Sequence, residues 1–203
     1  MKLILSTFLI LFLSSCSFFF KKVGGIRDPR FETHASIYKY AKTLEIDSAD
    51  IVFTKDSASL SKIAQLFGGG PEILTFDHTG KYFPYKNDSV ACNASIDRTL
   101  ENICKISSNG IKPFRHPQIN DLISWTADPN KTIPSSDSYD YIVFFNFSTY
   151  YDGINKTHIL PWNKILHKKN DSCRVKYVFV NEDYMLHWGM SKNSLPHLKI
   201  KAF

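Results

Sequence analysis

The chain has 203 residues, with 25 Lys and Arg against 19 Asp and Glu, a formal net charge of +6 and 14% aromatic residues. The hydrophobic fraction of 43% excludes wholesale disorder, and nine Gly and nine Pro without a repeat period exclude collagen-like and low-complexity classes. The length suits one domain. The positive charge is spread along the chain without a basic stripe, so we expect no nucleic-acid partner.

The first residues have the pattern of an export signal. Lys2 is followed by the uncharged apolar run 3–13, which is typical of a secretory signal peptide. The run ends in Leu13-Ser14-Ser15-Cys16, which resembles the bacterial lipobox. In that family the cysteine carries a diacylglycerol and becomes the first residue of the mature chain. The resemblance implies a signal peptide over 1–15, a lipidated tether over 16–30, and a body held at a membrane of the bacterial cell envelope, in the periplasm or at the cell surface.

Two alternative interpretations of this segment stay open. Residues 3–20 carry no charge and reach the lower length limit of a membrane span, so an uncleaved anchor is one alternative. A eukaryotic secreted protein is the other, because Asn-x-Ser/Thr sequons begin at Asn87, Asn93, Asn130, Asn146, Asn155 and Asn170. Asn146 lies within an apolar, strand-like run, where a glycan would block folding. All three interpretations place the body outside the cytoplasm, at a membrane.

The spacing of apolar residues predicts the order of elements in the first half of the chain. The expected elements are a helix at 35–44, a strand at 49–54, a helix at 60–66, a hairpin with strands at 72–76 and 81–85, and a helix at 95–104. Asp56 is the expected cap of the second helix, and the run of glycines from Gly68 is its expected end. From 107 to 138 four prolines interrupt the pattern, which predicts a long irregular connection with one helix-like patch at 118–125.

The second half predicts a strand at 140–147, a helix at 154–169 and a strand at 174–180. The strands are almost continuously apolar, which is typical of strands buried on both faces. A strand, helix and strand in succession require a parallel pair, whereas the hairpin requires an antiparallel one. We therefore expect a single α/β domain over 31–203, with a mixed parallel and antiparallel sheet and helices on both faces.

Two segments resemble halves of the thioredoxin fold. Residues 141–183 are similar to its central strand, active-site helix and next strand, with Pro161 in the helix. Residues 55–104 are similar to the other half, with Pro71 in the loop whose proline is cis in that family. The halves occur in reversed order, as in a circular permutation. The family's Cys-x-x-Cys positions fall on Gly153-Ile154-Asn155-Lys156, so the family's dithiol exchange is excluded.

The chain also resembles small lipoproteins of Bacteroidetes-type bacteria through Cys92-Asn93-Ala94 and the run 153–158. That resemblance implies no mechanism.

The cysteines allow one intramolecular disulfide at most. Apart from Cys16, the chain has Cys92, Cys104 and Cys173, so one thiol is left over. The thioredoxin resemblance places Cys92 before the last helix, where the helix dipole would stabilise a thiolate able to attack a disulfide or peroxide. The simpler interpretation is a Cys92–Cys104 disulfide or a passive thiol. We expect Cys104 and Cys173 to be structural.

Two further sets of candidate residues lie in the second half of the chain. Asp152, Asn155, Lys156 and His158 cluster at the start of the presumed active-site helix, where with Pro71 and Cys92 they would line a ligand groove. The simpler interpretation is that Asp152 caps this helix and the rest form a solvated turn. Met185 and Met190 offer soft sulfurs and His187 an imidazole, a set that suits Cu(I), although Met and Trp in such a segment more often pack against a sheet.

The sequence thus predicts a lipid-anchored envelope protein with a thioredoxin-like domain that lacks the dithiol. We expect it to bind a peptide, an envelope protein or a small ligand without catalysis and without a cofactor. A thiol-dependent redox protein using Cys92 is the first alternative, and a Cu(I) carrier is the second.

Overall fold

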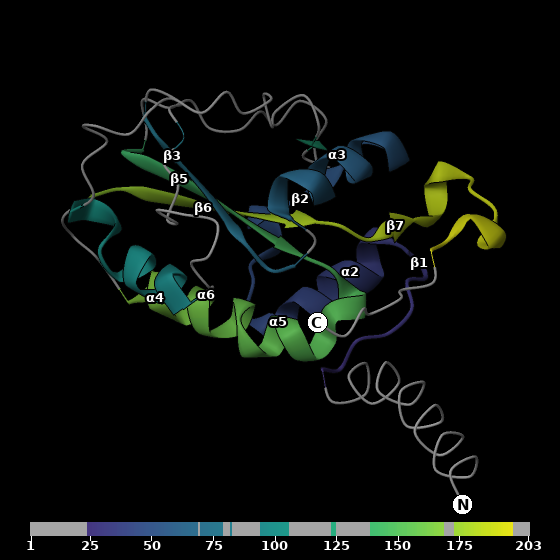
Figure 1. Ribbon diagram of the computed structural model, residues 1–203, viewed down its shortest axis with the longest axis horizontal. Helices are drawn as coiled ribbons and strands as arrows, with labels where there is room; N and C mark the ends of the chain where they lie inside the picture. The colour runs from purple at the N-terminus through teal and green to yellow at the C-terminus, as the bar shows by residue number, and fades with distance from the viewer. Residues whose placement is uncertain are drawn as a thin grey trace, which may run out of the picture.

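The computed structural model describes residues 24–68, 70–78, 82, 94–105, 123–124, 139–168 and 173–196. These residues form a five-stranded sheet (Figure 1) with the order β3 (Ile73–Asp77), β5 (Tyr141–Phe147), β6 (Val175–Asn181), β2 (Ile51–Thr54) and β4 (Ile123–Ser124). The three central strands are parallel, and the edge strands β3 and β4 are antiparallel to their neighbours. The mixed sheet expected from the sequence is confirmed.

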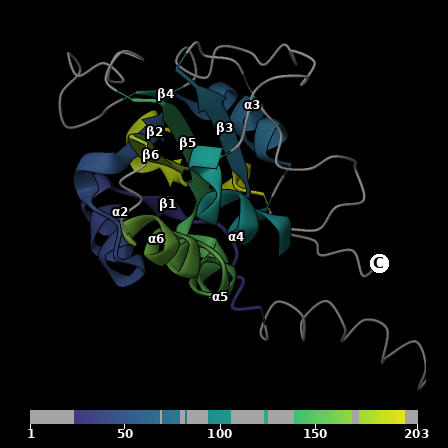
Figure 2. The ribbon, with the colours of Figure 1, turned by 90° about the vertical axis from the view of Figure 1, so that its left-hand side faces the viewer.

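Helices cover both faces of this sheet, as Figures 1 and 2 show. One face carries α3 (Ser57–Phe67), and the other carries α2 (His34–Ala41), α4 (Ala94–Glu101) and α6 (Ile159–His167). The two cores follow the alternation of side chains along each strand. Phe145 is buried with residues of α2, α4 and α6, whereas its neighbour Phe144 is buried with residues of α3.

Helix α3 begins and ends where its sequence signals predict. The Asp56 carboxylate accepts a hydrogen bond from the backbone N–H of Ser59 at 2.7 Å, which satisfies one of the free donors of the first turn. Gly68 ends the helix at a φ of +71°, a left-handed conformation that glycine adopts without steric cost.

The helix expected at 154–169 is instead two helices, α5 (Asp152–Thr157) and α6, which meet at His158. The cause is Pro161, which has no N–H to donate to the carbonyl of Thr157 and whose ring clashes with that carbonyl. Pro161 therefore lies in the first turn of α6, where the missing donor costs little.

Three further features were not predicted. β1 (Phe31–Glu32) pairs in parallel with β7 (Tyr184–Met185), and β4 forms within the expected helix-like patch at 118–125 by pairing with β2. Pairings of two residues are too short to show periodicity. Short 3-10 helices complete the fold at η1 (Lys42–Leu44), η2 (Ser48–Asp50), η3 (Ile103–Lys105), η6 (Thr149–Tyr151), η7 (Leu186–Trp188) and η8 (Lys192–Ser194).

Of the expected return strand at 81–85, Tyr82 is described, and it forms an antiparallel bridge with Phe76. The rest of that strand, most of the hairpin turn and most of the connection at 107–138 lie outside the described residues.

Candidate functional site

Buried acidic groups gather where the central strands end. β5 and β6 end side by side at Phe147 and Asn181, and Glu182 and Asp183 follow directly, with exposed fractions of 3% and 0%. The β1–β7 pairing adds Glu32, whose exposed fraction is 3%. Ligands of open α/β sheets bind at the carboxyl ends of parallel strands, so this end of the sheet is a candidate site. The run Val-Asn-Glu-Asp at 180–183 marks it in the sequence.

The Asp183 carboxylate is fully bonded within the protein. It accepts hydrogen bonds from the N–H of Thr149 at 3.0 Å, the hydroxyl of Thr149 at 2.8 Å and the amide of Asn181 at 2.7 Å. Burial raises the pKa of Asp183 to about 6, against the lowering effect of these hydrogen bonds. Asp183 therefore holds the start of η6 and has no oxygen left over for a ligand.

Glu32 has an equally internal role. Its carboxylate pairs with the Arg30 guanidinium, and it accepts hydrogen bonds from the hydroxyls of Ser36 and, at 3.1 Å, Thr149. These bonds fasten residues 24–32, which we call the strap, to α2 and η6.

The Glu182 carboxyl has a hydrogen-bond partner among the described residues at one of its two oxygens. Its Oε2 accepts a hydrogen bond from the Asn146 amide at 3.1 Å, while its buried Oε1 has no hydrogen-bond partner among the described residues. Burial raises the pKa of Glu182 to about 8, so the group is mainly a neutral acid at neutral pH. Asn146 also accepts from the N–H of Glu72 at 2.7 Å and donates to the carbonyl of Gly70 at 2.8 Å. This cluster joins both strand ends to the loop before β3.

The residues expected to line a groove are divided between interior and surface. Asn155 is 0% exposed, and its amide donates to the Tyr40 hydroxyl at 2.9 Å and to the carbonyl of Ser148 at 2.6 Å. Asp152 forms ion pairs with Lys156 at 3.0 Å and Arg27 at 3.4 Å. Asn155 is therefore structural, and the charged pair belongs to the surface of α5.

The remaining members of the expected groove are His158, Pro71 and Cys92. The His158 ring packs 5.5 Å from the ring of Trp162. Pro71 is buried before β3, and the described residues contain no cis peptide bond, so the cis proline implied by the family resemblance is wrong. Cys92 lies outside the described residues.

The strap covers the beginning of α5. The carbonyl of Gly25 accepts a hydrogen bond from the N–H of Gly153 at 3.4 Å, and the N–H of Arg27 donates to the carbonyl of Tyr150 at 2.8 Å. A Cβ on Gly153 would lie 2.3 Å from the carbonyl oxygen of Gly24. Gly153, to which the thioredoxin resemblance would assign the first redox cysteine, thus has no room for a side chain. Residues 24–30, which we expected to belong to the tether, pack against the domain.

The structure pairs Cys104 in η3 with Cys173 just before β6, with their Cα atoms 5.5 Å apart. The Cys92–Cys104 disulfide considered from the sequence is therefore wrong. The pairing depends on how η3 lies beside the start of β6, which spacing along the chain does not reveal.

The Cu(I) candidates do not share a surface. Met185 is 1% exposed and belongs to the main core, whereas His187 is exposed. Within the described ranges, no group of three His, Cys, Asp or Glu side chains is arranged to hold a metal ion.

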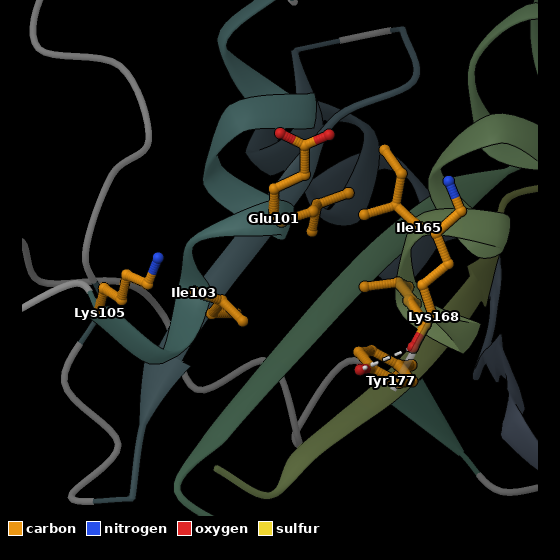
Figure 3. A pocket seen from close by; sticks show the side chains of 8 residues that line it. Glu101, Ile103, Lys105, Ile165, Lys168 and Tyr177 are labelled. Atoms are coloured by element: carbon orange, nitrogen blue, oxygen red, sulfur yellow. Dashed lines mark hydrogen bonds between the residues drawn. The ribbon is translucent and has the colours of Figure 1, made fainter. Parts of the chain in front are cut away.

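Two of the hollows lined by described residues have volumes of about 280 Å³ and 450 Å³. The first, of about 280 Å³, lies between α4 with η3 and α6 (Figure 3). Its wall includes Ile103, Ile165 and Tyr177, whose hydroxyl donates to the carbonyl of Leu166 at 3.4 Å. Its charged lining residues are Glu101, Lys105 and Lys168. The second, of about 450 Å³, lies between α3 and two tyrosines, Tyr150 and Tyr184.

Comparison of the chain with family models, curated proteins and solved structures found no match. In the part of the chain that the structure describes, no helix has the length and hydropathy needed to cross a bilayer.

Proposed function

We propose that the protein is a lipoprotein of the bacterial envelope, held at a membrane by a diacylglycerol on Cys16, whose α/β body binds a ligand without catalysis. The observation that carries this proposal is the motif Leu13-Ser14-Ser15-Cys16 at the end of an apolar leader. The Cys104–Cys173 disulfide supports it, because disulfides persist in oxidising compartments outside the cytoplasm.

Two sequons support a bacterial lipoprotein over a eukaryotic secreted glycoprotein. Asn146 and Asn155 are 2% and 0% exposed, and the side chain of each makes internal hydrogen bonds. A glycan on either amide would break those bonds and would not fit in the folded chain.

The polar groups at the end of the sheet already bond within the protein, which supports a binding role without catalysis. Asp183 and Glu32 are committed to the strap and η6, and Gly153 and Asn155 are enclosed at the positions of the family's cysteine motif. A permuted thioredoxin-like fold remains part of the proposal. It is supported by the position of β5 between β6 and β3, which puts the two resembling segments in one sheet.

The anchor is tested by mass spectrometry of the mature amino terminus and by membrane fractionation in a bacterial host. We expect a diacylglycerol-modified Cys16 in the wild-type chain, and loss of the lipid in the Cys16→Ser variant. The Cys92→Ser variant is the matched control and should keep the lipid. An unmodified amino terminus, or a lipid that survives Cys16→Ser, would contradict the proposal.

A thiol-dependent redox protein is the second candidate. The Cys104–Cys173 pairing favours it in one respect, since Cys92 then has no intramolecular partner once Cys16 is lipidated. Alkylation of the mature protein over a pH series tests it. Reaction of Cys92 with an apparent pKa well below that of a free cysteine would favour the redox protein, and an ordinary pKa would favour the binding body.

A further inference from the structure

We propose that the hollow between α3 and the tyrosines Tyr150 and Tyr184 binds a neutral saccharide. The inference deepens the proposed function, since it names the ligand class of the binding body and rests on that role.

The hollow has two unlike walls. Along α3, Ser57, Ser61 and Gln65 follow one another at intervals of four residues, which places them on one helix face about 6 Å apart. Across from them stand Tyr150 and Tyr184, and Leu60 is the buried lining residue of α3. Figure 1 shows α3 on one face of the sheet with β7, the strand of Tyr184, beyond the end of β6. The volume of about 450 Å³ lies within the range of small-molecule sites.

The chemistry of these walls matches a sugar. Serine hydroxyls and the glutamine amide each offer donors and acceptors, as the hydroxyl groups of a sugar do. Tyrosine rings supply flat apolar surface for the C–H face of a pyranose. The Tyr150 hydroxyl donates to the carbonyl of Glu182 at 3.4 Å, which fixes the orientation of its ring.

Charge argues against other ligand classes. No charged side chain is found among the described residues that line the hollow, so an anionic or cationic ligand would lose hydration without gaining a counter-charge. An extended peptide that adds to the edge of a sheet needs a strand of several residues there, whereas β7, the strand of Tyr184 at this hollow, has two residues. None of the five strands of the main sheet contributes a described residue to this hollow.

The test is titration of the full mature, lipidated chain by calorimetry, in a zwitterionic detergent without a sugar headgroup. The probes are the neutral trisaccharides maltotriose, cellotriose, triacetylchitotriose, xylotriose and mannotriose. We expect at least one of them to bind, and we expect Tyr184→Ala and Ser61→Trp each to weaken that binding by about tenfold or more.

Lys62→Trp is the matched control, because it places the same indole side chain at the neighbouring exposed position of α3, which does not line the hollow. Binding that persists in Ser61→Trp, or falls equally in Lys62→Trp, would place the sugar elsewhere and overturn the inference. Absence of binding for every trisaccharide, in a wild-type sample whose lipid and disulfide are verified, would also overturn it. That result would contradict a neutral saccharide as the ligand, while the verified lipid would still support the anchor.

Discussion

At the residue scale, Glu182 combines burial with a carboxyl oxygen, Oε1, that has no hydrogen-bond partner in the described part of the chain. Its pKa is raised by burial from 4.5 to about 8. Below pH 4.5 the carboxyl is protonated in both the folded and the unfolded chain. As pH rises toward 8, the unfolded chain loses the proton while the folded chain keeps it, so this group lowers the free energy of unfolding across that window.

We therefore expect Glu182→Gln to gain stability relative to wild type between pH 4.5 and about 8. The measurement is urea denaturation of both proteins at several pH values in that window. Asp183, with a pKa raised to about 6, contributes to both proteins in the same direction. Its charge also raises the pKa of Glu182, so the difference measures Glu182 together with its coupling to Asp183. Parallel pH profiles would show that Glu182 is ionised in the folded state.

Gly153 and Gly24 provide a second prediction at this scale. The Gly153→Ala variant places a methyl group 2.3 Å from the carbonyl oxygen of Gly24, and this backbone atom moves only if the strap shifts. We expect a loss of about 1–3 kcal/mol in the free energy of unfolding. Gly70→Ala is the control, because its added Cβ meets nothing within 4 Å, and it should change stability by less than about 0.5 kcal/mol. Equal stabilities of the two variants would mean that the strap does not lie against α5.

At the scale of elements, the Cys104–Cys173 disulfide joins η3 to the start of β6 across a sequence separation of 69 residues. Removing it with Cys104→Ser and Cys173→Ser together should cost about 2–5 kcal/mol, because the unfolded chain regains the freedom of a long loop. Denaturation without reductant measures the loss. Cys92→Ser should leave stability and the disulfide unchanged, and loss of the disulfide in this control would restore Cys92 as a bonding partner.

At the scale of elements, the pattern of apolar residues predicts the longer helices and strands but not the strands of two residues. Longer segments appear in the sequence because burial leaves a pattern in them, a continuous apolar run in β5 and a helical repeat in α3. β1, β4 and β7 each have two residues and exist because a neighbouring strand offers free backbone groups. The break at His158 follows from the missing N–H of Pro161, a local signal that the interpretation as one helix overlooked.

At the scale of the whole molecule, the strap fixes which end of the domain the proposed anchor holds. Gly24 lies against Gly153 at the start of α5, and Gly24 is the eighth residue after Cys16. Eight residues reach at most about 28 Å. A lipid on Cys16 would therefore keep the end of the sheet that carries α5 nearer to the bilayer than the opposite end, where β5 begins.

Nitroxide labels test this orientation in liposomes that contain a gadolinium-chelating lipid. We expect stronger relaxation of a label at Thr157, at the end of α5, than of a label at Asp140, just before β5. The Cys16→Ser chain, added to the same liposomes, should show little relaxation at either site. Stronger relaxation at Asp140 would contradict the orientation.

The amino-acid sequence by itself determined the α/β class, the presence of the longer strands and of α3, the cap of α3 and the absence of a Cys-x-x-Cys motif, because each depends on neighbouring residues or on the pattern along one element. Only the tertiary structure decided the partner of Cys104, the burial of Asn155, the docking of the strap on Gly153, and the gathering of Glu32, Glu182 and Asp183. These features join segments that are up to 151 residues apart, from Glu32 to Asp183. Such contacts are set by how the elements pack, and packing leaves no periodic signal in the chain.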